Sequence, residues 1–439
     1  MGLLPRGPLG LPRDGGRRPA FLSPSMQLHL LLAATALFSA APSLAAAPAE
    51  TLQRELDAMV AAGELPQALV LIEQHGKPLV ELSSGYADIE SRRPIARDAI
   101  FRLYSMSKPI TSVGIMMLAE RGKLALTDPV GKYLPEMANL RVWDGSKTAD
   151  TIAATRPVTI EDLLLHRSGL TYEFMGDTPV QRWYREKGVS RATAVASAHA
   201  QVPPAATLDD LVARLGQAPL LHQPGERFSY GFSTTVLGAV IERVSGESLD
   251  AFLKGNILDP LEMKDTTFVV SDTQAPRLVT GYLATEQGLR AVDLPETSEY
   301  RNSARLRDGG GALAGTLEDY RHFAEMLAGR GKWHGKRLLK PESVDAMYTP
   351  RLRTGGGEHL DSPFGYGLAI GDPGTEARGG LPVGAGSWSG SANTYFFADP
   401  AHDVIAILMT NELTPGPFEA RTWKLREALD RAALAVTKR

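Results

Sequence analysis

The chain reads FRLYSMSKPITSVGIMMLAER from residue 101 to residue 121. The second half of this stretch has apolar positions at helical spacing, namely Ile110, Val113, Met117 and Leu118. Gly122 follows directly, and glycine is typical of a helix end. The pattern therefore predicts a mostly buried helix over residues 109–121, with a short polar segment at its start.

Ser105 and Lys108 stand three positions apart where this helix starts. Residues at that spacing share one helix face, so the lysine amine can reach the serine hydroxyl. A serine needs a base to become a nucleophile, and a lysine is that base only when burial or nearby positive charge favours its neutral amine. The free N–H groups of a helix start can also bind an oxyanion. S-x-x-K alone also fits a surface serine and lysine.

Two further segments carry candidate residues. Tyr230 lies on a loop just before a predicted helix at 234–244, where its phenol could relay a proton between serine, lysine and leaving group. A packed core tyrosine is the alternative. Gly390 lies in Ser387-Trp388-Ser389-Gly390-Ser391, before a predicted strand at 394–398, where a substrate could approach and backbone N–H groups could complete an oxyanion hole. A plain hairpin loop is the alternative.

The remaining pattern places strands at both ends of the chain and helices in the middle. The predicted strands are 69–72, 79–82, 366–370, 394–398 and 404–409, and the other predicted helices are 159–165, 316–328 and 417–435. The economical assembly is an α/β (α+β) fold with one antiparallel sheet. We expect one catalytic unit over 46–439, in which 46–125 and 350–439 form the sheet domain and 126–349 a mostly helical insertion.

Composition excludes several function classes. The 439 residues carry a net charge of -3 and no cysteine, which argues against nucleic acid as a partner and rules out a thiolate nucleophile. Histidines show no metal-binding spacing, and no G-x-S-x-G elbow is present. We expect no metal and no cofactor. His166 is interpreted as structural, and Gly309-Gly310-Gly311 as a loop near the site.

The N-terminal residues 1–45 resemble a signal peptide. The run from Gln27 to Ala45 is short, apolar and rich in small residues, and it ends in a small-x-small pattern. It is too interrupted for a comfortable membrane span, and no cysteine is available for a lipid anchor. We therefore expect an exported protein, periplasmic or secreted, whose true start is Met1 or Met26. A buried N-terminal helix is the alternative.

Ser105-x-x-Lys108, Tyr230 and Trp388-x-Gly390 together resemble the serine β-lactamase and penicillin-binding protein superfamily. They occur in its order and approximate spacing, and the set is class C β-lactamase-like and most similar to family VIII carboxylesterases. Flanking similarity covers most of residues 60–410. The resemblance implies a β-lactamase/transpeptidase-like fold, an antiparallel sheet flanked by helices, with the active site between the sheet domain and the helical domain.

The resemblance also implies roles for individual residues. Ser105 corresponds to the nucleophile, Lys108 to the general base and Tyr230 to the proton relay. Trp388, Ser389 and Gly390 correspond to the third motif, and the N–H of Ser391 would join that of Ser105 in the oxyanion hole.

Two departures bear on the substrate. Phe232 stands where β-lactamases carry an asparagine, and Trp388 stands where they carry a cation. Both changes disfavour an anionic substrate and suit an uncharged, partly apolar ester. A carboxylesterase is therefore favoured over a β-lactamase or DD-peptidase, and an inactive binding protein is disfavoured by the intact Ser105, Lys108 and Tyr230. The expected partner is a small-molecule ester or β-lactam; the sequence leaves the oligomeric state open.

Overall fold

An antiparallel sheet joins the two ends of the chain, as predicted. The computed structural model describes residues 46–190, 202–352, 362–414 and 420–437, all within the unit Leu44–Arg439. Within those residues the sheet has seven strands in the order β13-β14-β15-β16-β1-β2-β3. The strands are β1 (Gln67–Gln74), β2 (Lys77–Asp88), β3 (Arg93–Pro94), β13 (Ala369–Ile370), β14 (Gly386–Ser389), β15 (Tyr395–Asp399) and β16 (Val404–Met409). The signal-peptide prediction lies outside the described residues.

The register of β1 explains why both ends of the chain are needed. On one side Leu71 of β1 pairs with Ile407 of β16, and on the other it pairs with Glu81 of β2. All residues of β1 and β16 are buried. Strands buried on both faces are continuous apolar runs, which is the pattern of β16 in the sequence. The N-terminal hairpin is therefore completed by a strand from the last forty residues.

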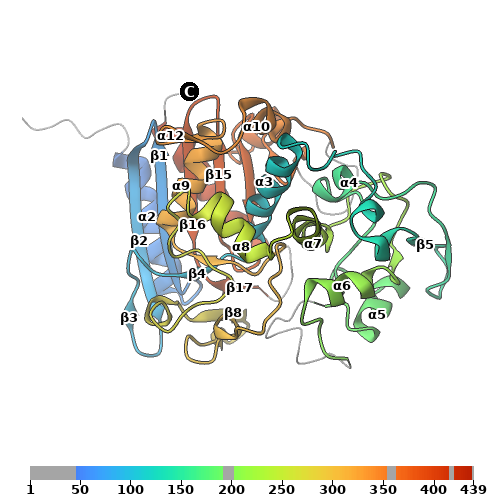
Figure 1. Ribbon diagram of the computed structural model, residues 1–439. Helices are drawn as coiled ribbons and strands as arrows, with labels where there is room; N and C mark the ends of the chain where they lie inside the picture. The colour runs from blue at the N-terminus through green and yellow to red at the C-terminus, as the bar shows by residue number, and fades with distance from the viewer. Residues whose placement is uncertain (1–45, 191–201, 353–361, 415–419, 438–439) are drawn as a thin grey trace, which may run out of the picture. The chain divides into compact units, whose positions relative to one another are not determined.

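Helices cover both faces of this sheet (Figure 1). Alternate side chains of β16 divide between two apolar clusters, because successive strand residues point to opposite faces. Ile407 joins the cluster that contains α9 (Leu317–Ala328), and Leu408 joins the cluster that contains α2 (Ala46–Ala61) and α12 (Ala420–Val436). The architecture is the predicted sheet flanked by helices.

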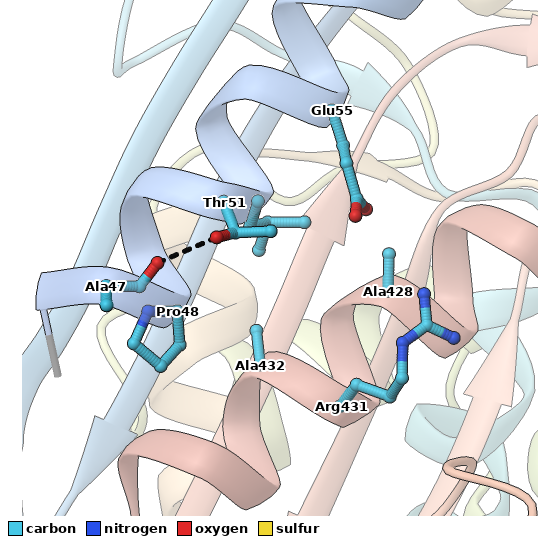
Figure 2. A pocket seen from close by; sticks show the side chains of 8 residues that line it. Ala47, Pro48, Thr51, Glu55, Ala428, Arg431 and Ala432 are labelled. Carbon is cyan, nitrogen blue, oxygen red and sulfur yellow. Dashed lines mark hydrogen bonds between the residues drawn. The ribbon is translucent and has the colours of Figure 1, made fainter.

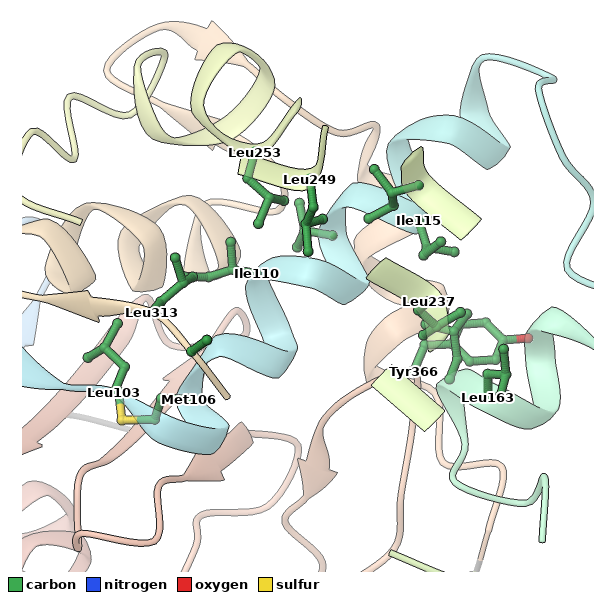
Figure 3. Close-up of a cluster of buried hydrophobic side chains, with 14 of the residues drawn as sticks. Leu103, Met106, Ile110, Ile115, Leu163, Leu237, Leu249, Leu253, Leu313 and Tyr366 are labelled. Carbon is green, nitrogen blue, oxygen red and sulfur yellow. The ribbon is translucent and has the colours of Figure 1, made fainter. Parts of the chain in front are cut away.

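The predicted helix of residues 109–121 is α3 (Ser107–Glu120), the centre of the larger cluster. Every residue from Ser107 to Leu118 is buried, which is typical of a helix packed on all sides. It packs against α7 (Ser233–Ser245) and α8 (Leu249–Leu253). Figure 3 shows side chains from these three helices meeting in the core.

Helix boundaries follow local capping chemistry. The side chain of Thr159 caps α4 (Ile160–Leu164) in a reciprocal capping box with Asp162. The N-cap of α9 is Thr316, whose hydroxyl accepts from the N–H of Asp319. Gly246 ends α7 in the left-handed conformation at φ 75°, which glycine adopts without strain.

The middle of the chain differs from the predicted helical insertion in two ways. It contains small sheets as well as helices, and α9 from this region packs against β15 and β16 of the main sheet. Its small strands are β5 (Arg141–Trp143), β6 (Thr151–Ala153), β7 (Pro219–Leu220), β8 (Gly281–Thr285), β9 (Gly288–Asp293), β10 (Ala314–Gly315), β11 (Lys332–Trp333) and β12 (Lys336–Arg337). Two strands from outside this region complete the small sheets, because β4 (Phe101–Arg102) pairs with β10 and β17 (Glu412–Leu413) pairs with β8. Their short lengths leave little periodicity for sequence analysis to detect.

The remaining described elements are short. They are η2 (Val130–Lys132), η3 (Pro135–Met137), α5 (Pro179–Glu186), α6 (Leu208–Leu215), η5 (Lys254–Leu258), η6 (Ala275–Arg277), η7 (Glu299–Arg301), α10 (Pro341–Tyr348) and α11 (Pro373–Ala377). Among the described helices, none combines the length and the apolar character needed to cross a bilayer.

Core packing around α3 yields a stability prediction. Leu237 on α7 is fully buried, so Leu237→Ala should lower the free energy of unfolding by about 2–5 kcal/mol. Leu79 on β2 is 38% exposed, so Leu79→Ala is a matched control that should change it by less than about 1 kcal/mol. Urea-induced unfolding measures both variants, and equal losses would contradict the placement of Leu237 in the core.

Candidate active site

Ser105 lies at the junction between a strand and the central helix. The turn η1 (Tyr104–Met106) contains it and leads directly into α3. The preceding strand β4 pairs with β10, and the N–H of Leu103 donates to the carbonyl of Leu313 at 2.9 Å. Ser105 is only 6% exposed. The serine is therefore held between a paired strand and a buried helix.

Lys108 is buried beside this serine. Its side chain is 1% exposed, and its Nζ donates to Ser105 Oγ at 3.1 Å. The same Nζ donates to the hydroxyl of Tyr172 at 3.1 Å and to the carbonyl of Gly310 at 2.5 Å. Two hydroxyls and a carbonyl thus lie within hydrogen-bonding distance of Nζ, and a hydroxyl can also donate to the amine when it is neutral.

Tyr230 reaches Ser105 from the opposite segment of the site. Its hydroxyl donates to Ser105 Oγ at 2.7 Å, and Lys108 Nζ lies 4.8 Å from the centroid of its ring. The residue comes just before α7, as predicted. The structure thus brings the three predicted residues Ser105, Lys108 and Tyr230 within hydrogen-bonding distance of a common oxygen. Such a set can activate a hydroxyl and move its proton.

A glycine brings Tyr230 and Tyr172 together. A Cβ on Gly231 would lie 2.5 Å from backbone atoms of Thr171, so only glycine allows the two loops to approach this closely. The rings of Tyr172 and Tyr230 then meet edge to face, with centroids 5.4 Å apart. Sequence analysis missed Tyr172, which lies on a loop two residues beyond the similar segment that ends at Leu170 and carries no motif of its own.

The carbonyl of Gly310 was also missed as a site group, although its glycine run was expected nearby. Asp308 fixes this loop, because its Oδ1 accepts from the N–H of Gly310 at 2.7 Å and from Thr235 Oγ1 at 2.6 Å. A Cβ on Gly310 would lie 2.7 Å from Thr235 Oγ1. The loop can therefore present its carbonyl to Lys108 only with glycine at this position.

His166 packs behind Tyr230, with ring centroids 5.0 Å apart. Burial, and secondarily the charge of Lys108, holds the pKa of His166 well below its usual value. Its Nδ1 is buried and has no hydrogen-bond partner among the described residues. The ring is therefore neutral at ordinary pH, and its structural interpretation stays a prediction.

The third motif lies against the segment that precedes Ser105. A Cβ on Gly390 would lie 2.4 Å from the carbonyl oxygen of Leu103, so glycine is required for this close approach. Trp388 of β14 packs its ring 5.6 Å from that of Tyr230 and 5.4 Å from that of Phe364. Trp388 thus contacts a predicted site residue directly.

Ser389 and Ser391 lie on either side of Gly390. Ser389 pairs with Tyr395 and is half-buried, whereas Ser391 is exposed. The contribution of the Ser391 N–H to an oxyanion hole stays a prediction.

Phe232 was predicted to contact substrate, but it lies in the core. Its side chain is fully buried, and its ring packs edge to face on Tyr172 with centroids 4.7 Å apart. A fully buried ring does not present a surface to substrate. Its observed contact is with the tyrosine that hydrogen-bonds Lys108, so its effect on the site runs through Tyr172.

One hollow of the described structure lies away from this chemistry. It has a volume of about 310 Å³ and is bordered by α2 and α12, with Thr51, Glu55 and Arg431 among its lining residues (Figure 2). None of the predicted site residues lines it. In the described part of the chain, no group of three or more His, Cys, Asp or Glu side chains is arranged to hold a metal ion.

The fold and the serine–lysine–tyrosine arrangement define a serine hydrolase of the S-x-x-K type. Residues 52–430 match the Beta-lactamase family. The chain belongs to this family, as its resemblance to the serine β-lactamase superfamily indicated.

The chain is similar to individual proteins of known name over most of its length. The chain is 35% identical to Protein Rv1367c of Mycobacterium tuberculosis over 79% of this chain and 86% of that protein. It is 30% identical to Esterase EstB of Burkholderia gladioli over 88% of this chain and 96% of that protein. Among solved structures it resembles EstCE1, a hydrolase with promiscuous acyltransferase activity, with a TM-score of 0.72, 26% identity and coverage of 89% and 98% of the two chains.

The unexpected contact of Tyr172 yields a prediction. Tyr172→Phe removes a hydrogen bond of 3.1 Å to the buried Lys108 Nζ, so kcat should fall about 10-fold or more with little change in KM. Tyr282→Phe is the matched control, because Tyr282 is also fully buried and its hydroxyl bonds to the N–H of Ile89 and to Glu90. Steady-state kinetics of both variants would contradict the role of Tyr172 if their losses were equal.

Proposed function

We propose that this Beta-lactamase-family hydrolase cleaves uncharged carboxylic esters through an acyl-enzyme on Ser105. The observation that carries the proposal is the convergence of Lys108 Nζ, at 3.1 Å, and the Tyr230 hydroxyl, at 2.7 Å, on Ser105 Oγ. A nucleophile needs a base within this distance. The serine has two proton-transfer groups and lies at the start of α3, where N–H groups can bind an oxyanion.

Acylation follows from these contacts. Ser105 Oγ forms a bond to the ester carbonyl carbon, while its proton passes to Lys108 directly or by way of Tyr230. The carbonyl oxygen becomes an oxyanion, and collapse of this intermediate breaks the bond to the alcohol, which leaves with a proton from the same pair. Water then attacks the acyl-enzyme by the reverse proton transfers and releases the carboxylic acid.

The surroundings of Ser105 support an uncharged substrate. Trp388, which stands in the third motif in place of a cation, packs against Tyr230 with its apolar ring. Esterase EstB and the hydrolase EstCE1 are similar to this chain over nearly its whole length. A β-lactam is the second candidate substrate, favoured by the match to the Beta-lactamase family, because the same acyl-enzyme would form on opening a lactam ring.

Paired substrates test the proposal. The purified protein should hydrolyse p-nitrophenyl butyrate rapidly and nitrocefin slowly, and Ser105→Ala should abolish both while it leaves the melting temperature unchanged. Lys108→Ala should lower kcat/KM by about 10²–10⁴-fold, since a positioned base contributes that much. Ester hydrolysis that survives in Ser105→Ala would refute the nucleophile. Faster turnover of nitrocefin than of the ester would instead favour the β-lactam function.

A lysine in place of Trp388 tests whether residue 388 selects substrates by their charge. Trp388→Lys should raise the ratio of nitrocefin to p-nitrophenyl butyrate kcat/KM by about 10-fold, because a hydrogen bond to a charged group contributes roughly 1.5–3 kcal/mol. Trp388→Phe keeps an apolar ring and serves as the control with an unchanged ratio. The same ratio in both variants would show that residue 388 does not select substrate charge.

A further inference from the structure

The residue before the nucleophile has an unusual backbone conformation. Tyr104 has a φ of 45°, a region that bulky side chains rarely adopt because the Cβ is crowded there. Such a conformation persists only where surrounding contacts hold it. Since Ser105 follows directly, whatever holds Tyr104 also directs the backbone of the nucleophile.

The ring of Tyr300 supplies one of those contacts. The rings of Tyr104 and Tyr300 meet edge to face, with centroids 6.3 Å apart. Tyr300 lies on η7 and is itself 4% exposed. The guanidinium of Arg305 covers its ring at 3.8 Å, and Arg305 is anchored by hydrogen bonds to the carbonyls of Phe268 and Ala312. The Tyr300 ring is thus a fixed support for Tyr104.

The hydroxyl of Tyr300 reaches the glycine loop that contacts Lys108. It donates to the carbonyl of Gly311 at 3.3 Å. The neighbouring carbonyl of Gly310 accepts from Lys108 Nζ at 2.5 Å. A single side chain therefore contacts the residue next to the nucleophile and the loop that carries a lysine acceptor.

We infer that Tyr300 is a positioning residue that sets Ser105 and Lys108 relative to each other, through its ring on one side and its hydroxyl on the other. The inference rests on the proposed function, because it concerns the activation of Ser105 by Lys108. It gives a role to a tyrosine that lies about two hundred residues beyond the S-x-x-K motif and in none of the recognised motifs.

The test separates the ring from the hydroxyl. The second-order rate at which a fluorophosphonate labels Ser105 reports nucleophile activation without regard to substrate class. Tyr300→Phe should lower this rate about 3–10-fold and Tyr300→Leu about 30–100-fold, since small misplacements of reacting groups cost up to about 10²-fold. The pH dependence of labelling should shift in Tyr300→Phe, because the loop that contacts Lys108 has lost a restraint.

Tyr282 provides the matched control. It is fully buried on β8, and its hydroxyl bonds to the N–H of Ile89 and to Glu90, away from the residues of the site. Tyr282→Phe and Tyr282→Leu should reduce the melting temperature as their Tyr300 counterparts do but leave the labelling rate and its pH profile unchanged. Equal losses of labelling in the two series would overturn the inference, since Tyr300 would then be an ordinary core residue.

A double substitution tests the link through Tyr104. Glycine adopts a φ of 45° without crowding, so in a Tyr104→Gly background the ring of Tyr300 has no strained residue to hold. In this background Tyr300→Leu should lower the labelling rate of Ser105 by less than about 3-fold, instead of about 30–100-fold, because the effects of coupled substitutions are not additive. An unchanged cost would overturn the role of the ring.

Two further outcomes are decisive. If Tyr300→Leu does not fold, Tyr300→Phe decides, and a labelling rate and pH profile equal to wild type would overturn the inference. Wild-type protein that labels at Ser105 but cleaves neither ester nor β-lactam would refute the proposed function alone, whereas wild-type protein that does not label would refute both.

Discussion

The buried amine of Lys108 is the constraint on which the rest of the site depends. A charged or ionisable group is removed from water only at a large cost unless its hydrogen bonds are replaced. Lys108 finds its acceptors in Ser105, Tyr172 and Gly310, which come from the central helix start, a loop after α4 and a glycine loop before β10. The fold must bring these three segments together to bury the base, and in doing so it assembles the nucleophile.

The same contacts determine how protons are held. Ser105 Oγ accepts from both Lys108 and Tyr230, so protons are shared over a tightly packed set of groups. The Ser105 hydroxyl therefore has two proton-transfer partners at hydrogen-bonding distance. His166 lies behind Tyr230, and burial, with the nearby lysine, keeps the pKa of its imidazole well below the usual value. Its neutral ring supports Tyr230 by packing alone.

Local signals in the sequence were sufficient for the main elements. The helix after Ser105, the capped helices α4 and α9, and the continuous apolar strand β16 were predicted because periodicity and caps are properties of neighbouring residues. The placement of α9 on the main sheet was not predictable in this way, since it depends on packing between β15–β16 and a helix far earlier in the chain. The short strands of the middle region were too brief to show a period.

The candidate site also contains residues that the sequence predicted and residues that only the fold brings together. Ser105, Lys108 and Tyr230 were predictable because their motif is recognisable, and the structure places them together. Tyr172 and Gly310 contact Lys108 across separations of 64 and 202 residues, which no local pattern encodes. For Phe232, the sequence showed that the family's asparagine is replaced, but it did not show that the ring is buried.

Phe232 and Tyr172 together relate the departures from the β-lactamase pattern to the chemistry. An apolar ring at residue 232 offers no hydrogen bond to its surroundings, and it lies against Tyr172, whose hydroxyl accepts from the lysine. The aromatic pair therefore satisfies the buried amine and fills the adjacent space without a polar amide. Trp388 packs on Tyr230, so aromatic rings lie beside the serine, and the amine of Lys108 is bonded to Ser105, Tyr172 and Gly310. This aromatic environment supports the proposed neutral acyl group, because a neutral group leaves water without losing the hydration of a charge.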